Sequence, residues 1–425
     1  MTEIAERFIP YRNAEIIDML CQEGSLDQKQ QQQFRDFCTI LESLYHFEFH
    51  AKVKALKNYY HPFDPDQDTK TGRIYSPEEL QQYETKLVAN LSEVLNDANY
   101  EQLTEDDLNY ALKEESLFPI SLEIDFADFA SYMIQRRGDV VKKTTIKKWF
   151  FWTQEIEVPT YERVVMLIKF KDSEYFATKG YKEPPFDPGS MVIKLFKNIP
   201  KADLEMLFPN AKVKMRLSDK LIMGVPAIGG AIGIFMKTGA GLIAFIVVLM
   251  ALIRSLFHGG EVTMPNATQF AQIVGGITAL GAIIGFVVQQ WTKYKTRKIE
   301  FLKTLGDSLY FKNLDNNAGV FHHIIDTAEE EECKEAILGY YFLLKHPDGL
   351  TEAVLDHTIE QWFATKYNTI LDFEVDDALR KLKELELCTY QHPQPDSEIV
   401  YQALSLENAC IRIDTIWDNY FQYNV

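Results

Sequence analysis

"LIAFIVVLMALI" at residues 242–253 and "FAQIVGGITALGAIIGFVVQQW" at residues 270–291 are two apolar runs near the middle of a chain of 425 residues. The surrounding segment 239–257 contains a single charged residue, Arg254, and the segment 270–290 contains none. A helix needs about 20 apolar residues to cross the hydrocarbon core of a bilayer, which is about 30 Å thick. The sequence therefore predicts a central transmembrane helical hairpin with spans at about 239–257 and 270–290.

The basic residues around these runs predict their orientation. Seven Lys/Arg lie in residues 194–220 and five in residues 293–303, whereas residues 255–269 contain none. By the positive-inside rule both flanks are cytoplasmic, which requires an even number of crossings. We therefore expect an integral, multi-pass membrane protein with cytoplasmic N- and C-termini. A shorter run at residues 221–236 is expected to be re-entrant or interfacial, with a third span as the alternative.

Gly281 and Gly285 form a GxxxG pattern inside the second predicted span. Small residues at this spacing allow two helices to approach closely. We predict that they serve helix packing within the hairpin, with a homodimer contact as the alternative.

Composition limits the possible partners. The net charge is −18 and the mean hydropathy is −0.19, so the chain is acidic and its apolar residues are locally concentrated. An acidic surface repels phosphates, which argues against nucleic acid. The five cysteines have no metal-binding spacing, as in a reduced cytosolic protein. The first residues lack the apolar segment of a signal peptide.

The fold class expected is α+β, mainly α, in four parts. Residues 1–135 are predicted as a helical cytoplasmic domain and residues 136–218 as a small α+β module. Residues 219–292 form the membrane segment. Residues 293–425 contain three amphipathic helices followed by a strand–turn–strand pattern, which is the order of a winged-helix-like domain.

Three stretches carry residue types that bind metals. "HFEFH" places His46 and His50 at i and i+4, on one face of a helix. "DPDQDTKTG" at residues 64–72 resembles the start of a calcium loop but lacks its glycine and final glutamate. "HHIID" at residues 322–326 is the third. Each stretch alone is an incomplete ligand set, so we predict no metal, cofactor or catalytic residue. Whether the chain is an enzyme stays open.

Six stretches resemble the domain-of-unknown-function 3754 family, which includes animal transmembrane protein 143. They are "ERFIPYR" from Glu6, "YYHPFDPD" from Tyr59, "IKLFKNIPKADLEMLFPNAKVKM" at 193–215, "YFKNLDNNAGV" from Tyr310, "EEEECKEAILGYYFLL" from Glu329 and "FEVDDALRKLKELEL" from Phe373. The resemblance implies a central membrane hairpin and, because the family has no agreed activity, no catalytic residues.

Two of these blocks flank the membrane segment. Their polar residues are Lys197, Asn198, Asp203, Lys312, Asn313, Asp315 and Asn316. We expect them to meet at the cytoplasmic membrane surface as a headgroup or partner site, with capping and turn chemistry as the alternative.

The function expected is that of a membrane-anchored interaction or assembly protein. Its partners would be the lipid bilayer and a protein, with homo-oligomers as a further possibility. The first alternative is an oligomeric transport or channel component. The second is a membrane-associated metal-dependent hydrolase. The sequence names no reaction, ligand or particular membrane.

Overall fold

The computed structural model describes residues 5–67, 69, 72–104, 107–108, 121–148, 152–181, 183–184, 186–214, 243, 246–247, 250, 266–392 and 398–421. The chain is a mixed α+β protein with 60% helix, as expected from the sequence, and its sheets are antiparallel. It divides into two compact units. The first comprises Met1–Ala111, Phe126–Lys201 and Lys312–Val425, and the second comprises Leu112–Asp125 and Ala202–Phe311.

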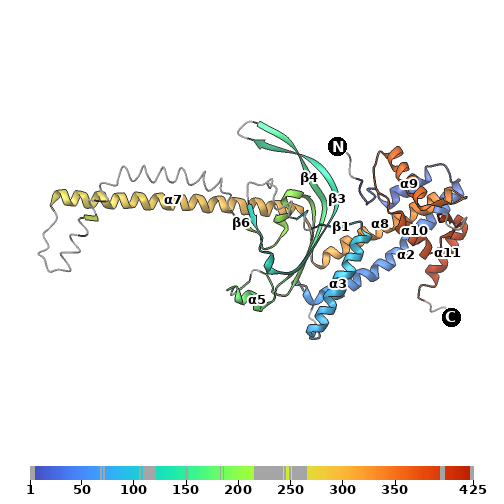
Figure 1. Ribbon diagram of the computed structural model, residues 1–425, viewed down its shortest axis with the longest axis horizontal. Coiled ribbons are helices and arrows are strands. Elements are labelled where there is room, and N and C mark those ends of the chain that lie inside the picture. Colours follow the sequence, from blue (N-terminus) through green and yellow to red (C-terminus); the bar gives the residue numbers. More distant parts are fainter. Residues whose placement is uncertain are drawn as a thin grey trace. The chain divides into compact units, whose positions relative to one another are not determined.

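The first unit begins with three helices and a short 3-10 turn. They are α1 (Asn13–Cys21), α2 (Gln28–Tyr60), η1 (His61–Phe63) and α3 (Pro77–Asp97) (Figure 1). Helix α2 begins at a capping box in which the Asp27 side chain accepts from the Gln30 N–H. Helix α3 begins in the same way, with Ser76 as N-cap and Pro77 at the first position. These helix starts are local, so the sequence alone predicts them.

A five-stranded antiparallel sheet follows, in the order β1-β3-β4-β5-β7. Its strands are β1 (Glu101–Gln102), β3 (Phe129–Lys148), β4 (Trp152–Phe170), β5 (Met191–Pro200) and β7 (Asn313–Asn316); η2 (Phe126–Asp128) precedes β3 and α5 (Ser173–Thr178) connects β4 to β5. Strand β3 begins before residue 135, where the sequence predicted helix. Further along the same strand, Arg136 binds Glu101 at 2.7 Å and Arg137 binds Glu331 at 3.3 Å.

The C-terminal part of the first unit contains the three predicted helices and the predicted strand pair. Its elements are α8 (Ala318–Lys345), β8 (Leu350–Thr351), α9 (Glu352–Tyr367), α10 (Val375–Glu384), β9 (Cys388–Gln391), β10 (Val400–Ala403) and α11 (Leu406–Asp418). The three strands form an antiparallel sheet in the order β8-β10-β9.

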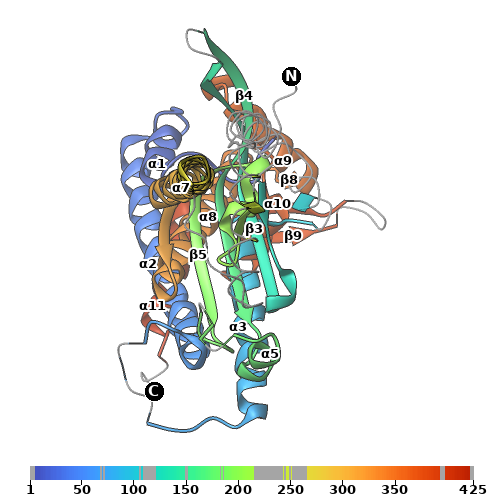
Figure 2. The ribbon, with the colours of Figure 1, turned by 90° about the vertical axis from the view of Figure 1, so that its left-hand side faces the viewer.

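Helix α8 lies at the centre of this unit and packs against α2, α3 and α10 (Figure 2). Phe37 of α2 stacks on Tyr340 of α8 with ring centroids 4.5 Å apart. One continuous hydrophobic core contains residues from the N-terminal helices, the sheet and the C-terminal helices. The unit therefore draws on three of the four segments into which the sequence was divided.

The second unit contains β2 (Ser121–Glu123), β6 (Lys212–Lys214), most of η3 (Lys201–Leu207) and α7 (Ala267–Lys312). Strands β2 and β6 pair antiparallel. Within α7, Ile273–Lys293 is long and apolar enough to cross a membrane, and 11% of its most apolar window is buried. This is the one such helix among the described residues.

Most of the remaining predicted membrane segment lies outside the described residues. The run at 221–236 lies outside the described residues, and 239–257 is described only at residues 243, 246, 247 and 250, so no hairpin is shown. The membrane segment was predicted to end at residue 292, and α7 itself continues without a break to Lys312. Residues 293–312 contain no proline, and most of them favour helix, so nothing there ends it.

Asn317 joins three elements of the first unit. Its backbone adopts φ 50° and ψ −133°, in the half of conformational space that L residues rarely occupy. Its buried side chain accepts from the Tyr60 hydroxyl at 2.9 Å and the Ile193 N–H at 3.3 Å, and donates to Asp66. Asn317 thereby ties the start of α8 to the end of α2 and to β5.

We expect Asn317→Ala to lower the free energy of unfolding by about 2–4 kcal/mol. The Ile193 N–H loses its side-chain acceptor, and an alanine keeps the strained φ without any compensating hydrogen bond. Denaturant unfolding of the detergent-solubilised chain measures the change. The neighbouring Asn316→Ala, at an exposed position, is the control and should change stability by less than about 0.5 kcal/mol. Equal effects of the two substitutions would refute this role for Asn317.

Candidate functional site

The two blocks that flank the membrane segment supply adjacent strands of one sheet. Strand β5 pairs antiparallel with β7, so that Phe196 lies opposite Asn313 and Leu195 opposite Asp315. Seven residues were singled out from these blocks. Lys197 and Asn198 lie on β5, Lys312 ends α7, Asn313, Asp315 and Asn316 lie on β7, and Asp203 lies in η3 within the second unit.

Two of these residues have clear side-chain roles within the first unit. Asn198 has a positive φ of 54° within β5 and accepts a hydrogen bond from Lys142 Nζ at 2.6 Å. Asp315 instead lines a cleft between α2 and α8.

Gly281 and Gly285 lie on α7, where an added Cβ would meet no described atom within 4 Å. No described element therefore packs against them.

The cleft has a volume of about 710 Å³ and opens to solvent. It is lined by His46, His50, Val53, Lys54, Lys57 and Asn58 of α2, by Asp315 of β7, and by Gly319, His322, His323, Ile325, Asp326 and Glu329 of α8. Such a volume suits a small ligand or an ion with its water. We call it the histidine cleft.

The cleft lies along two antiparallel helices, and two contacts define their register. His46 of α2 hydrogen-bonds Glu329 of α8, and Tyr60 at the end of α2 hydrogen-bonds Asn317 at the start of α8. Moving forward along α2 from His46 therefore corresponds to moving back along α8 from Glu329. By this register His50 of α2 lies near the level of Asp326 of α8, and Lys54 of α2 near the level of His322 of α8.

Two imidazole–carboxylate pairs line the cleft. His46 Nδ1 is 3.1 Å from both carboxylate oxygens of Glu329, and His323 Nε2 is 3.4 Å from Asp315 Oδ2. When the imidazole of such a pair is neutral, the ring nitrogen that faces the carboxylate carries the proton. His46 Nε2 and His323 Nδ1 therefore keep a lone pair for another partner.

The environment of these pairs is partly apolar. Burial raises the pKa of Glu329, and the hydrogen bond from His46 opposes that rise. Gly319 permits the approach of Asp315 because a Cβ at position 319 would collide with the Asp315 carboxylate. His50 and His322 are exposed and, among the described residues, have no hydrogen-bond or ion-pair partner.

The structure brings together two stretches that the sequence left separate. "HFEFH" and "HHIID" each show an incomplete ligand set, and 271 residues separate their ends. Both carry an i,i+4 pair, His46 with His50 and His322 with Asp326, and that shared spacing was the available signal. The stretch "DPDQDTKTG" forms local hydrogen bonds and binds Asn317. Asp64 Oδ1 accepts from the Asp66 N–H at 3.0 Å, and Asp66 accepts from Asn317. Asp68 lies outside the described residues.

A second group of ionisable residues is buried beside α8. Among the described residues, the one set of three potential metal ligands within 4.8 Å of one another is Glu332, Glu335 and Asp377. The ammonium of Lys381 already lies in this set, 2.9 Å from Glu332 and bonded to Glu335. Asn99 donates to Glu335 at 3.0 Å. The set is therefore an ion-pair network that already contains its cation.

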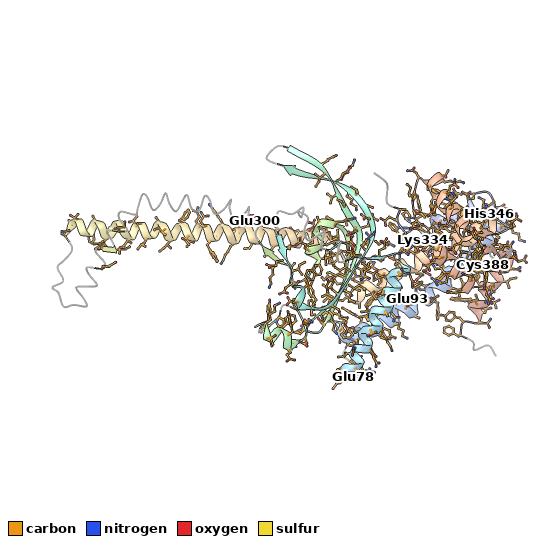
Figure 3. The ribbon with its side chains drawn as sticks, in the orientation of Figure 1. Glu78, Glu93, Glu300, Lys334, His346 and Cys388 are labelled. Atoms are coloured by element: carbon orange, nitrogen blue, oxygen red, sulfur yellow. The ribbon has the colours of Figure 1, made fainter. Side chains whose placement is uncertain are left out.

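A second buried ion-pair network binds the N-terminal segment to α8. Lys334, labelled in Figure 3, donates to Glu331 at 2.9 Å and to the Ile9 carbonyl at 2.8 Å. Glu331 in turn accepts from the Ile9 N–H at 3.1 Å. The motifs "ERFIPYR" and "EEEECKE" thus bind each other across the core.

Glu335 is expected to make stability depend on pH. Burial raises the pKa of Glu335 to about 7, against the opposing effect of Lys381. The unfolded chain releases this proton near pH 4.5. Between these values the folded protein binds more protons, so its stability falls as the pH rises. From about pH 5 to about pH 8 we expect the wild type to lose about 1–3 kcal/mol more than Glu335→Gln.

Denaturant titrations of both proteins at each pH measure this difference. The comparison isolates Glu335 because the other titrating groups are common to both chains. Parallel pH profiles for the two chains would show that Glu335 does not titrate as stated.

Residues 161–319 match the family model described as protein of unknown function (DUF3754). The matched range begins in β4 and ends in the first turn of α8. It contains Asp315 and Gly319 of the histidine cleft, whereas His46, His50 and His322 lie outside it. The family description assigns no activity. The chain therefore contains a DUF3754 domain at residues 161–319, which confirms the family predicted from its motifs.

Proposed function

We propose that this chain is a membrane-anchored interaction or assembly protein. It presents its first unit, here called the soluble unit, on the cytoplasmic face. The observation that supports this most is the exposed apolar surface of α7. Ile277, Ile284 and Val288 are 57%, 62% and 56% exposed. A water-soluble helix hides such residues in a core, whereas a bilayer accommodates them.

Two further features support a hairpin as the anchor. The apolar run at 239–257 is long enough for a second span, and the Lys/Arg distribution favours two cytoplasmic flanks. Helix α7 also ends at Lys312 and β7 begins at Asn313, with no linker between them. The soluble unit is therefore joined directly to the anchor helix.

We further propose that the C-terminal elements are a winged-helix-like module that binds protein. The chain order α8-β8-α9-α10-β9-β10 and the sheet order β8-β10-β9 are those of a winged helix. On α10, Arg380 contacts Asp377 at 3.0 Å and Glu384 at 3.4 Å, and Lys381 is buried. Because these cations are engaged with carboxylates, α10 is poorly suited to phosphates and better suited to a protein partner.

Topology is tested by protease protection of sealed, oriented vesicles that carry tagged chains. Tags at the N-terminus and the C-terminus should lie on one side, and a tag at Gly259–Gly260 on the other. End tags on opposite sides would contradict the hairpin. Equal accessibility of all three tags would contradict the anchor.

The interaction itself is tested by photo-cross-linking in the native membrane. A photoreactive residue at the exposed position Glu384 of α10 should capture a discrete protein. The same residue at the exposed position Lys29 of α2 is the control and should not capture that protein. Absence of any discrete product at Glu384 would count against the interaction module.

A further inference from the structure

We infer that the histidine cleft binds one divalent transition-metal ion through His46 and His50 of α2 and His322 and Asp326 of α8. This inference does not depend on the proposed membrane or interaction function. It rests on the positions of these side chains within the first unit.

Each helix contributes one i,i+4 pair. His46 and His50 share a face of α2, and His322 and Asp326 share a face of α8. Both faces line the same cleft. Because the helices run antiparallel in the register set by the His46–Glu329 and Tyr60–Asn317 contacts, the two pairs occupy overlapping stretches along the cleft. Paired ligands on facing helices are a general way in which helical proteins build metal sites.

A supporting hydrogen bond orients one ligand in advance. Histidines that bind metals usually donate their second ring N–H to a carboxylate, which holds the ring and strengthens its lone pair. Glu329 makes this contact with His46 Nδ1 at 3.1 Å and leaves Nε2 directed elsewhere. Glu329 is therefore a positioning residue, and its partial burial strengthens the contact.

The ligand types select the class of metal. Imidazoles with one carboxylate suit Zn²⁺, Co²⁺ or Ni²⁺, whereas Mg²⁺ and Ca²⁺ prefer sites made of oxygen alone. No three of the four ligand atoms lie within 4.8 Å of one another, so the side chains must turn inward onto the ion. His46, His50, His322 and Asp326 are all exposed, which leaves their rotamers free to do so.

An anion is the competing occupant, because Lys54 and Lys57 also line the cleft. Three carboxylates, those of Asp315, Asp326 and Glu329, line it as well and would repel an anion. The same carboxylates attract a cation. The charge of the cleft therefore favours a metal ion over a phosphate.

The test measures Zn²⁺ and Co²⁺ binding to the full chain in detergent, free of any histidine tag, by calorimetry and by the visible absorption of Co²⁺. We expect one ion per chain. His50→Ala and His322→Ala should each lower the affinity by at least about tenfold. His357→Ala, at an exposed histidine of α9, should leave the affinity unchanged.

Matched variants examine the positioning role and the competing anion. Glu329→Gln should lower Zn²⁺ affinity by about 10–100-fold, whereas Glu330→Gln at the next residue should not. Lys54→Ala should keep or increase Zn²⁺ affinity, because it removes a positive charge from the cleft. Circular dichroism of each variant verifies that the fold is retained.

Three results would overturn the inference. If His322→Ala and Asp326→Asn bind Zn²⁺ as the wild type does while His50→Ala does not, the ion binds a surface pair on α2 alone. If His357→Ala weakens binding equally, the ion binds nonspecifically. If the wild type binds inorganic phosphate without metal, and Lys54→Ala abolishes that binding, the cleft is an anion site.

Discussion

Lys381→Met is expected to lower the free energy of unfolding by about 3–5 kcal/mol, the largest single effect on stability that we foresee. Lys381 is 2% exposed and its ammonium contacts Glu332 and Glu335, which are also buried. Removing one partner from a buried ion pair leaves uncompensated charge in a medium of low polarity. Burial lowers the pKa of Lys381, but the two carboxylates outweigh it and raise that pKa overall.

The control for this prediction is the neighbouring residue. Arg380 also contacts two carboxylates, Asp377 and Glu384, but 47% of its side chain is exposed. Arg380→Met should therefore cost less than about 1 kcal/mol. Denaturant unfolding of both variants gives the comparison. Similar losses for the two substitutions would show that burial does not set the strength of this network.

A rescue experiment distinguishes charge from packing. Adding Glu332→Gln and Glu335→Gln to Lys381→Met removes the stranded charges and should recover part of the lost stability. If the triple variant is no more stable than Lys381→Met, the loss comes from the shape of the side chain.

The second large effect is expected in α7. Leu280→Asp together with Ile284→Asp should prevent the helix from crossing the membrane. An aspartate at the centre of a span costs about 2.5–3.5 kcal/mol, so the pair costs about 5–7 kcal/mol. In the tagged vesicles, the C-terminal tag of this variant should move to the side of the Gly259–Gly260 tag. Leu280 and Ile284 are exposed, so neither substitution removes a core contact of the first unit. Because that core combines N-terminal and C-terminal elements, placing the two ends on opposite sides of the membrane should also prevent the first unit from assembling.

The matched control uses the same helix beyond the apolar window. Ile299 and Leu302 are 64% and 47% exposed and lie outside Ile273–Lys293. Ile299→Asp with Leu302→Asp should leave all three tags in place. A C-terminal tag that stays with the N-terminal tag in the Leu280→Asp, Ile284→Asp variant would mean that α7 does not cross.

Short stretches of sequence predict much of the local structure. The starts of α2 and α3 follow from the capping boxes at Asp27 and Ser76, because a cap involves residues only three apart. The three C-terminal helices and their strand pair follow from periodicity in the same way. The start of β3, at residues 129–135, was missed because its strand conformation is decided by pairing with the distant end of β4.

The histidine cleft could not be predicted from local sequence patterns. His46 and Asp326 each belong to a stretch that is unremarkable alone. Their juxtaposition depends on the antiparallel register of α2 and α8, which the contacts of Asn317 and the core around Tyr340 determine. No periodicity within either helix encodes that register.

The sequence by itself determined the helical elements, the apolar runs of membrane length and the family, because each depends on the order of nearby residues. Only the tertiary structure decided that the two ends of the chain share one core, that Lys381 is buried between two glutamates, and that two histidine stretches line one cleft. The physical reason is that these features arise from contacts between residues hundreds of positions apart, and packing of whole elements selects them.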